Sequence, residues 1–225
     1  MIVIINNHTK ANSKNVCGSL TYTLIKFLKL TKTRYKVLNN SIESNNYIKR
    51  YNKNIKGFIF SGSSKSINEV NLDDLVTMNY IVFNFNKPII GICFGHQYLA
   101  KIHGSTINSF RNIFSGQRLT NIKPFTLLPY KASYDLTYHH FDYVKNAPHC
   151  FIVISKTNNI VTLIEHKYRP IFGTQFHLDH KNMNYESFNI YFNFLKLCDE
   201  KHKKEFDLNE LYNFTKKKEY KIDDI

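Results

Sequence analysis

The sequence predicts an α/β fold: a mostly parallel central sheet with helices on both faces and an antiparallel β extension. In the first half of the chain, short apolar runs largely alternate with amphipathic helical patterns, which is typical of a parallel sheet covered by helices. From about residue 105 to 165 short strand-like runs dominate, which indicates antiparallel strands. With 225 residues and 43% hydrophobic content, the chain is long enough to bury a full core.

In the first half, the expected strands are runs of Ile, Val and Phe, and the expected helices carry apolar residues at three- and four-residue spacing. The pattern predicts strands over 1–5, 34–38, 56–61 and 88–92, and helices over about 14–29, 69–80 and 94–103.

In the second half, the pattern predicts short strands over 105–108, 118–122, 135–138, 151–154 and 161–165. Another strand-like run begins at Ile171, and a helix near 184–197 carries core residues at helical spacing, namely Phe188, Tyr191, Phe192 and Leu195. We assign residues 1–198 to one domain. Residues 199–225 are polar and charged, and we expect a C-terminal extension with one short helix and a frayed end.

Composition indicates the cellular compartment and the kinds of partner that we expect for the chain. The four cysteines show neither paired nor metal-ligand spacing, which favours a reducing, cytoplasmic location. No apolar run approaches membrane length, and no signal segment opens the chain. The net charge of +14 comes from lysines scattered among asparagines, isoleucines and tyrosines rather than gathered with aromatic residues, which argues against nucleic-acid binding.

The most informative stretch is Gly91-Ile92-Cys93-Phe94-Gly95-His96-Gln97, which joins an apolar run to an amphipathic helical segment. A nucleophile at a strand-to-helix corner points out of the sheet, near the positive end of the helix dipole. That field lowers the pKa of a thiol, and the thiolate is the reactive form. Gly91 and Gly95 would leave room for the turn, so we expect Cys93 at an exposed corner. The alternative is a buried cysteine packed as a small hydrophobic residue.

A candidate base lies near the other end of the chain. The strand-like run over 171–177 ends in His177, and Asp179 follows two positions later. A cysteine nucleophile needs a base to take its proton, and the base needs a partner that fixes its tautomer. Cys93, His177 and Asp179 can supply these three roles. A lone histidine at a strand end is more often structural, so the assignment of His177 depends on Cys93.

These two stretches resemble class I glutamine amidotransferases, whose nucleophile motif reads G-x-C-x-G-x-Q and whose base motif reads G-x-Q-F-H-P-E. Residues 59–64 are similar to the family's strand and Ser-Gly-Gly-Pro oxyanion loop. Residues 139–144, followed by Ala147, Pro148 and Phe151, resemble a segment typical of the amidotransferase part of GMP synthases. The resemblance covers about residues 1–198, with four motifs in the family's order.

The resemblance implies a glutaminase. In the family, the thiolate attacks the side-chain amide carbon of glutamine, releases ammonia, and leaves a glutamyl thioester that water hydrolyses. Cys93 would be the nucleophile and His177 the general base and acid, while Asp179 stands where the family has an orienting glutamate. The backbone N–H groups of Ser63 and Phe94 would form the oxyanion hole. Glutamine itself would be bound by Gly62, Gln97, His140, Phe141 and Asp142.

Two departures from the family pattern fall on catalytic positions. Leu178-Asp179 replaces Pro-Glu, so the carboxylate is one methylene shorter, although aspartate orients the histidine in many unrelated triads. Ser63-Ser64 replaces Gly-Pro in the oxyanion loop. If the family's glycine has a positive φ there, a serine would adopt that geometry only at a cost.

The sequence contains no motif that predicts a bound cofactor or metal. Residues 61–66 lack the first glycine of a phosphate-binding G-x-x-x-x-G-K-[ST] loop, so we expect no nucleotide-activating domain. The chain would then need a separate ATP-dependent synthetase to use the ammonia. The stretches 139–142 and 177–180 contain histidines but lack the spacing of common metal sites.

Two alternative functions stay open. Stand-alone members of the same superfamily carry a very similar nucleophile motif and cleave γ-glutamyl amides of peptides, so the chain could be a γ-glutamyl peptidase. It could also be a catalytically silent scaffold that keeps the amidotransferase-like fold. The departures at Ser63 and Asp179 are the kind of change that a silent scaffold would carry.

Overall fold

The computed structural model describes residues 1–8, 17–178 and 185–198. Within these residues, nine strands form one mixed sheet. The strands are β1 (Ile2–Asn6), β2 (Tyr35–Asn39), β3 (Gly57–Phe60), β4 (Ile89–Ile92), β5 (Ile107–Ile122), β6 (Ala132–Val144), β7 (Phe151–Thr157), β8 (Ile160–His166) and β9 (Ile171–Thr174). Their order is β2-β1-β3-β4-β9-β8-β6-β5, and β7 pairs with β8.

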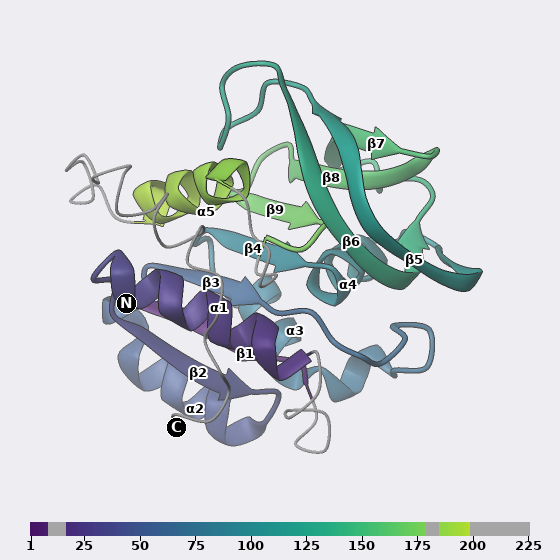
Figure 1. Ribbon diagram of the computed structural model, residues 1–225. Coiled ribbons are helices and arrows are strands. Elements are labelled where there is room, and N and C mark those ends of the chain that lie inside the picture. The colour runs from purple at the N-terminus through teal and green to yellow at the C-terminus, as the bar shows by residue number, and fades with distance from the viewer. Residues whose placement is uncertain (9–16, 179–184, 199–225) are drawn as a thin grey trace.

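Helices cover both faces of the parallel part of this sheet (Figure 1). They are α1 (Cys17–Leu30), α2 (Ile42–Tyr51), α3 (Val76–Asn84), α4 (Phe94–Ile102) and α5 (Tyr185–Cys198). Helices α1 and α5 share one core cluster, and α2, α3 and α4 share the other.

The strand β1 shows how the two cores arise. Successive side chains of a strand point to opposite faces. Ile2 and Ile4 therefore enter the core with α1 and α5, whereas Val3 and Ile5 enter the core with α2 and α3. A strand that is buried on both faces reads as a continuous apolar run. Strands β2, β1, β3, β4 and β9 are parallel to one another, which confirms the predicted α/β class.

The antiparallel extension begins where β8 pairs with β9. Strand β6 then pairs with β8, and β5 with β6, so β5 and β6 form a long ribbon that projects from the body (Figure 1). The sequence predicts several short strands here, but β5 runs through 16 residues and β6 through 13. Most side chains of β5 are exposed, so no alternation of apolar and polar residues marks it as one strand.

Two helical segments differ from the sequence-based expectation. Helix α2 has no predicted counterpart, because it is short and mostly polar, and Ser44 and Ile48 are its only buried residues. The helix predicted over 69–80 is divided into a 3₁₀ turn at Leu72–Asp74 and α3, and α3 extends to Asn84. The predicted short helix after residue 198 lies outside the described residues.

The fold brings the two candidate catalytic stretches together. Strands β4 and β9 are parallel neighbours, so the residues that follow them meet at one edge of the sheet. Cys93 follows β4, and the stretch with Gln175 and His177 follows β9. No helix among the described residues is long and apolar enough to cross a membrane.

Candidate active site

Cys93 occupies a strained turn between β4 and α4. Its φ of 50° and ψ of −99° lie outside the regions that non-glycine residues commonly occupy. The turn is held by the Cys93 N–H, which donates to the Thr174 carbonyl at 2.7 Å, and by the Gln97 N–H, which donates to the Cys93 carbonyl at 3.0 Å. Backbone strain of this kind concentrates at functional sites and is typical of nucleophiles at strand-to-helix turns.

The two glycines that flank Cys93 are required by close packing. A Cβ on Gly95 would lie 2.5 Å from the Phe60 carbonyl oxygen, and one on Gly91 would lie 2.5 Å from the Gly95 carbonyl oxygen. Neither backbone atom can move away as a flexible side chain could. The expectation that these positions must be small is therefore confirmed.

The expected exposure of Cys93 is wrong, since only 4% of the residue is accessible to solvent. Strand β6 lies over the turn, and the Cys93 Sγ is 3.9 Å from the His139 carbonyl oxygen. On another side, the Gln175 Nε2 approaches the Sγ to 3.5 Å. Both covering residues are distant in sequence, so the local motif could not reveal that they shield the sulfur.

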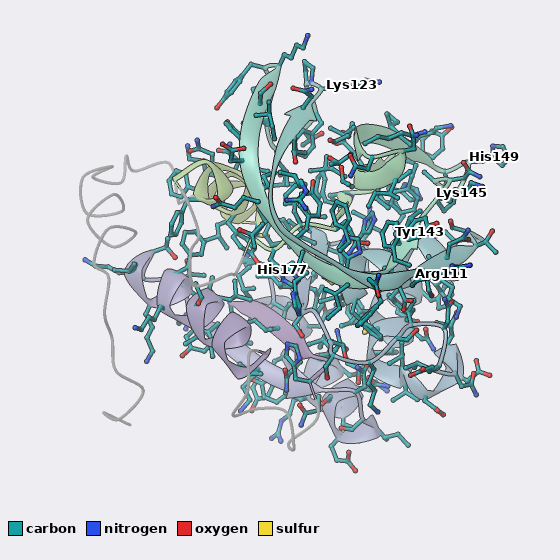
Figure 2. The ribbon with its side chains drawn as sticks, turned by 45° about the vertical axis from the view of Figure 1, so that its right-hand side comes forward. Arg111, Lys123, Tyr143, Lys145, His149 and His177 are labelled. Atoms are coloured by element: carbon teal, nitrogen blue, oxygen red, sulfur yellow. The ribbon has the colours of Figure 1, made fainter. Side chains whose placement is uncertain are left out.

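His177 reaches the same place from the other strand. Its backbone N–H donates to the Thr137 carbonyl at 2.8 Å, and its Nε2 lies 3.3 Å from the His139 carbonyl oxygen. The Cys93 thiol and the His177 imidazole thus converge on one oxygen of β6. Figure 2 shows His177 where the first half of the chain meets the β5–β6 ribbon.

The loop after β3 forms a further wall of this site. A Cβ placed on Gly62 would lie 3.5 Å from the His177 Cε1 and 3.8 Å from the Cys93 Cβ. Gly62 therefore faces both candidate catalytic side chains. Asp179, the expected third member of the triad, lies outside the described residues.

The oxyanion-loop serine fits its position without backbone strain. Ser63 is not among the described non-glycine residues with positive φ. Its Oγ donates to the Asn7 carbonyl at 3.0 Å and accepts the Lys65 N–H at 3.1 Å. Phe94 is the first residue of α4, so its backbone N–H has no acceptor within the helix.

Of the residues expected to bind glutamine, Gln97 is buried, with 3% of its surface exposed. Its Nε2 donates to the Asp142 carbonyl at 2.7 Å and to the Gln175 Oε1 at 3.2 Å. The His140 Nδ1 lies 2.9 Å from the same carbonyl. The Asp142 backbone oxygen is therefore already used within the protein.

The Asp142 carboxylate connects the ribbon to the loop that follows Gly62. It accepts the Ser66 Oγ–H at 2.5 Å, the Ile67 N–H at 2.9 Å and the Ser109 Oγ–H at 2.6 Å. These bonds fix β6 relative to the loop that carries Ser63, one of the two candidate oxyanion donors. Phe141, by contrast, points outward and is about half exposed.

Gln175 also lies at the site, although the sequence analysis predicts no role for it. It lies two positions before His177 and is completely buried. Gln175 matches the glutamine of the base motif G-x-Q-F-H-P-E, and this match is the sequence signal that could have found it.

Two buried histidines near the site are held in the neutral form. Burial lowers the pKa of His96 and that of His140 to about 4 each. The His96 Nε2 lies 3.2 Å from the Val161 carbonyl, and its Nδ1 packs against the backbone of Gly173. At neutral pH neither ring can therefore act as a general acid, although its N–H can still donate a hydrogen bond.

The buried histidines predict that the protein loses stability in acid. An unfolded histidine binds a proton near pH 6.5, whereas folded His96 and His140 stay neutral until about pH 4. Between these values the unfolded state binds more protons, so the free energy of unfolding falls as the pH falls. The slope should be about 1.4 kcal/mol per pH unit for each histidine.

Urea unfolding at several pH values between 7.5 and 4.5 measures this slope. His96→Gln should be less stable at pH 7.5 but should lose less stability on acidification. His149→Gln is the matched control, because His149 is exposed and lies on the outer surface (Figure 2). Equal slopes for the wild type and His96→Gln would contradict the account.

A second cluster of ligand-type side chains lies away from Cys93. Potential ligand atoms of His103, Cys150 and His166 lie within 4.8 Å of one another. However, the His166 Nδ1 accepts the backbone N–H groups of Tyr168 and Arg169 at 3.1 Å each. The proton of neutral His166 must then reside on Nε2, so neither ring nitrogen offers a free electron pair to a metal.

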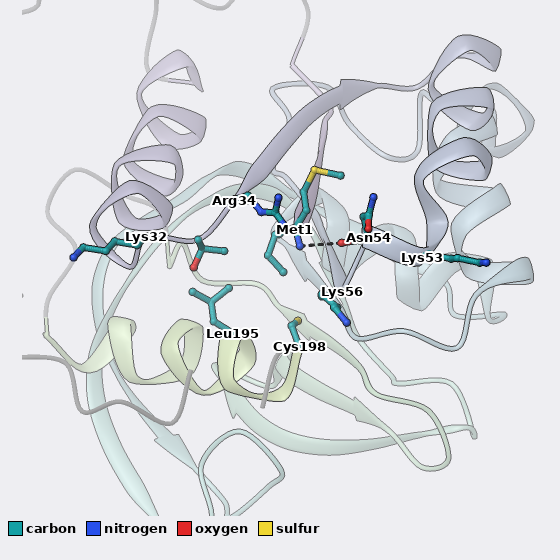
Figure 3. A pocket seen from close by; sticks show the side chains of 10 residues that line it. Met1, Lys32, Arg34, Lys53, Asn54, Lys56, Leu195 and Cys198 are labelled. Carbon is teal, nitrogen blue, oxygen red and sulfur yellow. Dashed lines mark hydrogen bonds between the residues drawn. The ribbon is translucent and has the colours of Figure 1, made fainter. Parts of the chain in front are cut away.

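A pocket of about 250 Å³ lies at the opposite edge of the sheet, by the amino ends of β1, β2 and β3 (Figure 3). Its lining includes Arg34, Lys56 and Cys198, and the backbone amine of Met1 donates to the Asn54 carbonyl at 3.0 Å. The side chains of Lys32 and Lys53 point away from it. The pocket is therefore separate from the site at Cys93.

The chain matches the model of the glutamine amidotransferase class-I family over residues 14–197. This range contains the strained Cys93 turn, the loop after β3, the β6 segment and His177. The chain belongs to this family.

The chain resembles curated relatives of two kinds, short subunits and a longer enzyme. A subunit of glutamine-hydrolyzing GMP synthase from Methanococcus aeolicus is 30% identical over 203 residues, which cover 88% of this chain and 97% of the relative. The corresponding subunit from Pyrococcus abyssi is 32% identical over 152 residues, which cover 65% and 78% respectively. The glutamine-hydrolyzing GMP synthase of Spiroplasma kunkelii is 30% identical over 127 residues, covering 55% of this chain. The match spans 24% of the length of that longer relative.

Solved structures support the fold. A structure described as that of a GMP synthase subunit from Thermoplasma acidophilum superposes with a TM-score of 0.71 at 24% identity, covering 89% of this chain and 94% of the other. A glutamine amidotransferase from Thermotoga maritima gives a TM-score of 0.59 at 16% identity, covering 96% and 90%. At these identities the likeness concerns the fold alone.

Proposed function

We propose that this chain is a glutaminase that releases ammonia from L-glutamine through a thioester on Cys93. The observation that carries the proposal is the convergence of the Cys93 Sγ and the His177 Nε2 on the His139 carbonyl oxygen, beneath the loop at Gly62. A thiol, an imidazole and a wall of small residues at one sheet edge suit attack on a planar amide.

The proton transfers follow from the two side chains. His177 takes the thiol proton as the Cys93 sulfur attacks the amide carbon of glutamine, and it gives that proton to the departing ammonia. Water then attacks the thioester with His177 again as the base, which yields glutamate and restores the thiol. Asp179 would bind the other ring nitrogen of His177 and fix its tautomer.

Two backbone donors are proposed to stabilise the tetrahedral intermediates. The Ser63 N–H makes no hydrogen bond within the described residues, and the Phe94 N–H opens α4 near the positive end of its dipole. Donors of this kind are each worth about 2.7–4 kcal/mol of transition-state stabilisation in well-studied hydrolases.

The ammonia is proposed to serve a separate ATP-dependent synthetase that resembles the larger part of GMP synthases. Support comes from the relatives, which include separate subunits of glutamine-hydrolyzing GMP synthases. Glutaminase assays of the chain, alone and with a candidate synthetase from the same genome, test this proposal. Ammonia release that the synthetase stimulates is the expected result, whereas cleavage of γ-glutamyl peptides in preference to glutamine would indicate a γ-glutamyl peptidase.

A diazo-ketone analogue of glutamine should label Cys93 alone, because the analogue must bind as glutamine does before its reactive carbon meets the sulfur. Cys150 is partly exposed, so it is an internal control for nonspecific alkylation. Peptide mass spectrometry measures the label at each cysteine. Labelling spread evenly over several cysteines would contradict the assignment of the nucleophile.

A further inference from the structure

The side chain of Gln175 contacts the candidate nucleophile directly. It is completely buried, and its Nε2 lies 3.5 Å from the Cys93 Sγ. Its Oε1 accepts a hydrogen bond from the Gln97 Nε2 at 3.2 Å. The Gln97 Nε2 also donates to the Asp142 carbonyl at 2.7 Å. A continuous chain of hydrogen bonds therefore runs from β6 through two amides to the sulfur.

The carbonyl of Asp142 determines the direction of this whole chain. A backbone carbonyl can only accept, so the Gln97 atom that faces it must be the NH₂ group. That NH₂ group also faces Gln175, so the Gln175 atom opposite it must be the oxygen. The remaining Gln175 atom, which faces Cys93, is therefore the NH₂ group. The network fixes which end of each amide is the donor.

We propose that Gln175 stabilises the thiolate of Cys93 by donating an N–H to its sulfur, and that Gln97 is a positioning residue that holds the Gln175 amide in this orientation. This inference rests on the proposed function, in which the thiolate attacks glutamine. An amide NH₂ donates and cannot accept, so it favours the charged form of the sulfur over the neutral one.

The surroundings of the Cys93 sulfur increase the effect of the Gln175 N–H on the thiolate. Only 4% of Cys93 is exposed, so water has little access to solvate the thiolate. The nearby His139 carbonyl is an acceptor, and an acceptor favours the protonated thiol instead. A hydrogen bond to a charged group in such a place is stronger than one between neutral groups.

The rate of alkylation of Cys93 by iodoacetamide, followed by peptide mass spectrometry across pH, reports thiolate formation without any need for glutamine. Gln175→Met removes the donor at similar volume, and Gln175→Glu replaces the donor by an acceptor of nearly identical shape. Gln117→Glu is the matched control, because it makes the same chemical change at an exposed position on β5. Thermal unfolding of each variant confirms that it is folded.

The pH of half-maximal alkylation should rise by about one to two units in Gln175→Met, and further in Gln175→Glu. Gln97→Met should give a smaller rise, because its loss frees the Gln175 amide to turn. Gln117→Glu should leave the midpoint unchanged. A folded Gln175→Met whose midpoint matches that of the wild type would overturn the inference, whether or not Gln175→Glu shifts.

The alkylation experiment and the glutaminase assay can fail independently of each other. A wild type without glutaminase activity would overturn that function, yet the alkylation midpoints would still decide whether Gln175 stabilises the thiolate. Conversely, an active wild type with unchanged midpoints would retain the function and reject the role of Gln175.

Discussion

Replacing Cys93 by serine is expected to lower the rate of ammonia release from glutamine by about ten-thousandfold or more. A serine hydroxyl is a far weaker nucleophile than a thiolate, and the surrounding groups are arranged for sulfur. Loss of the nucleophile in a triad hydrolase costs a factor of this order or larger. Coupled detection of ammonia measures the rate directly.

Cys150→Ser is the matched control for this prediction. Cys150 is a partly exposed free cysteine that lies with His103 and His166, away from Cys93. Its replacement should change the rate less than twofold. Retention of more than about one per cent of activity in Cys93→Ser, or an equal loss in Cys150→Ser, would show that the nucleophile is wrongly assigned.

The parallel half of the fold is largely predictable because both faces of its sheet are covered. Strands β1, β3 and β4 are buried on both sides, so each reads as an uninterrupted apolar run. Helix α2 has no such signal, since Ser44 and Ile48 are its only buried residues and Ile42 is exposed. Its best marker is Ser41, whose side chain accepts the Ser44 N–H as an N-cap.

The β5–β6 ribbon is less predictable for the same physical reason. Strand β5 has few buried side chains, so the burial that normally reveals a strand is missing along it, whereas β6 buries alternate residues over its second half. The two strands are joined through backbone pairing from Ile107 to Ile122, interrupted by an irregularity between Ser109 and Phe114. Backbone pairing leaves little trace in side-chain chemistry.

The candidate site can be inferred from the sequence where its chemistry resides in side chains with fixed spacing. Cys93 and His177 fall in that class. The His139 carbonyl, on which both converge, has no sequence signal, because every residue carries a carbonyl. The burial of Cys93 likewise depends on a strand more than forty residues away, as the 46-residue separation of Cys93 and His139 shows.

Asp179→Asn is expected to lower turnover by about three to four orders of magnitude if Asp179 orients His177, as the same change does in a serine protease triad. The His177 Nε2 lies on the side of the ring that Cys93 approaches, so the Nδ1 is the nitrogen left for a carboxylate. His177 acts as a base in the tautomer with its proton on Nδ1, in which the Nε2 makes no hydrogen bond to the His139 carbonyl. An amide at residue 179 can stabilise the wrong tautomer, which leaves the Nε2 protonated and unable to act as a base. Steady-state kinetics with glutamine measures the loss in kcat.

Three further measurements separate a working triad from a silent scaffold. Asp179→Glu restores the family's residue and should preserve or raise activity. Adding Ser63→Gly to Asp179→Glu should bring little further gain, because Ser63 already lies outside the positive-φ region. A wild type that stays inactive with a synthetase present, and that neither change rescues, would support the scaffold. An active wild type that is insensitive to Asp179→Asn would instead show that another group orients His177.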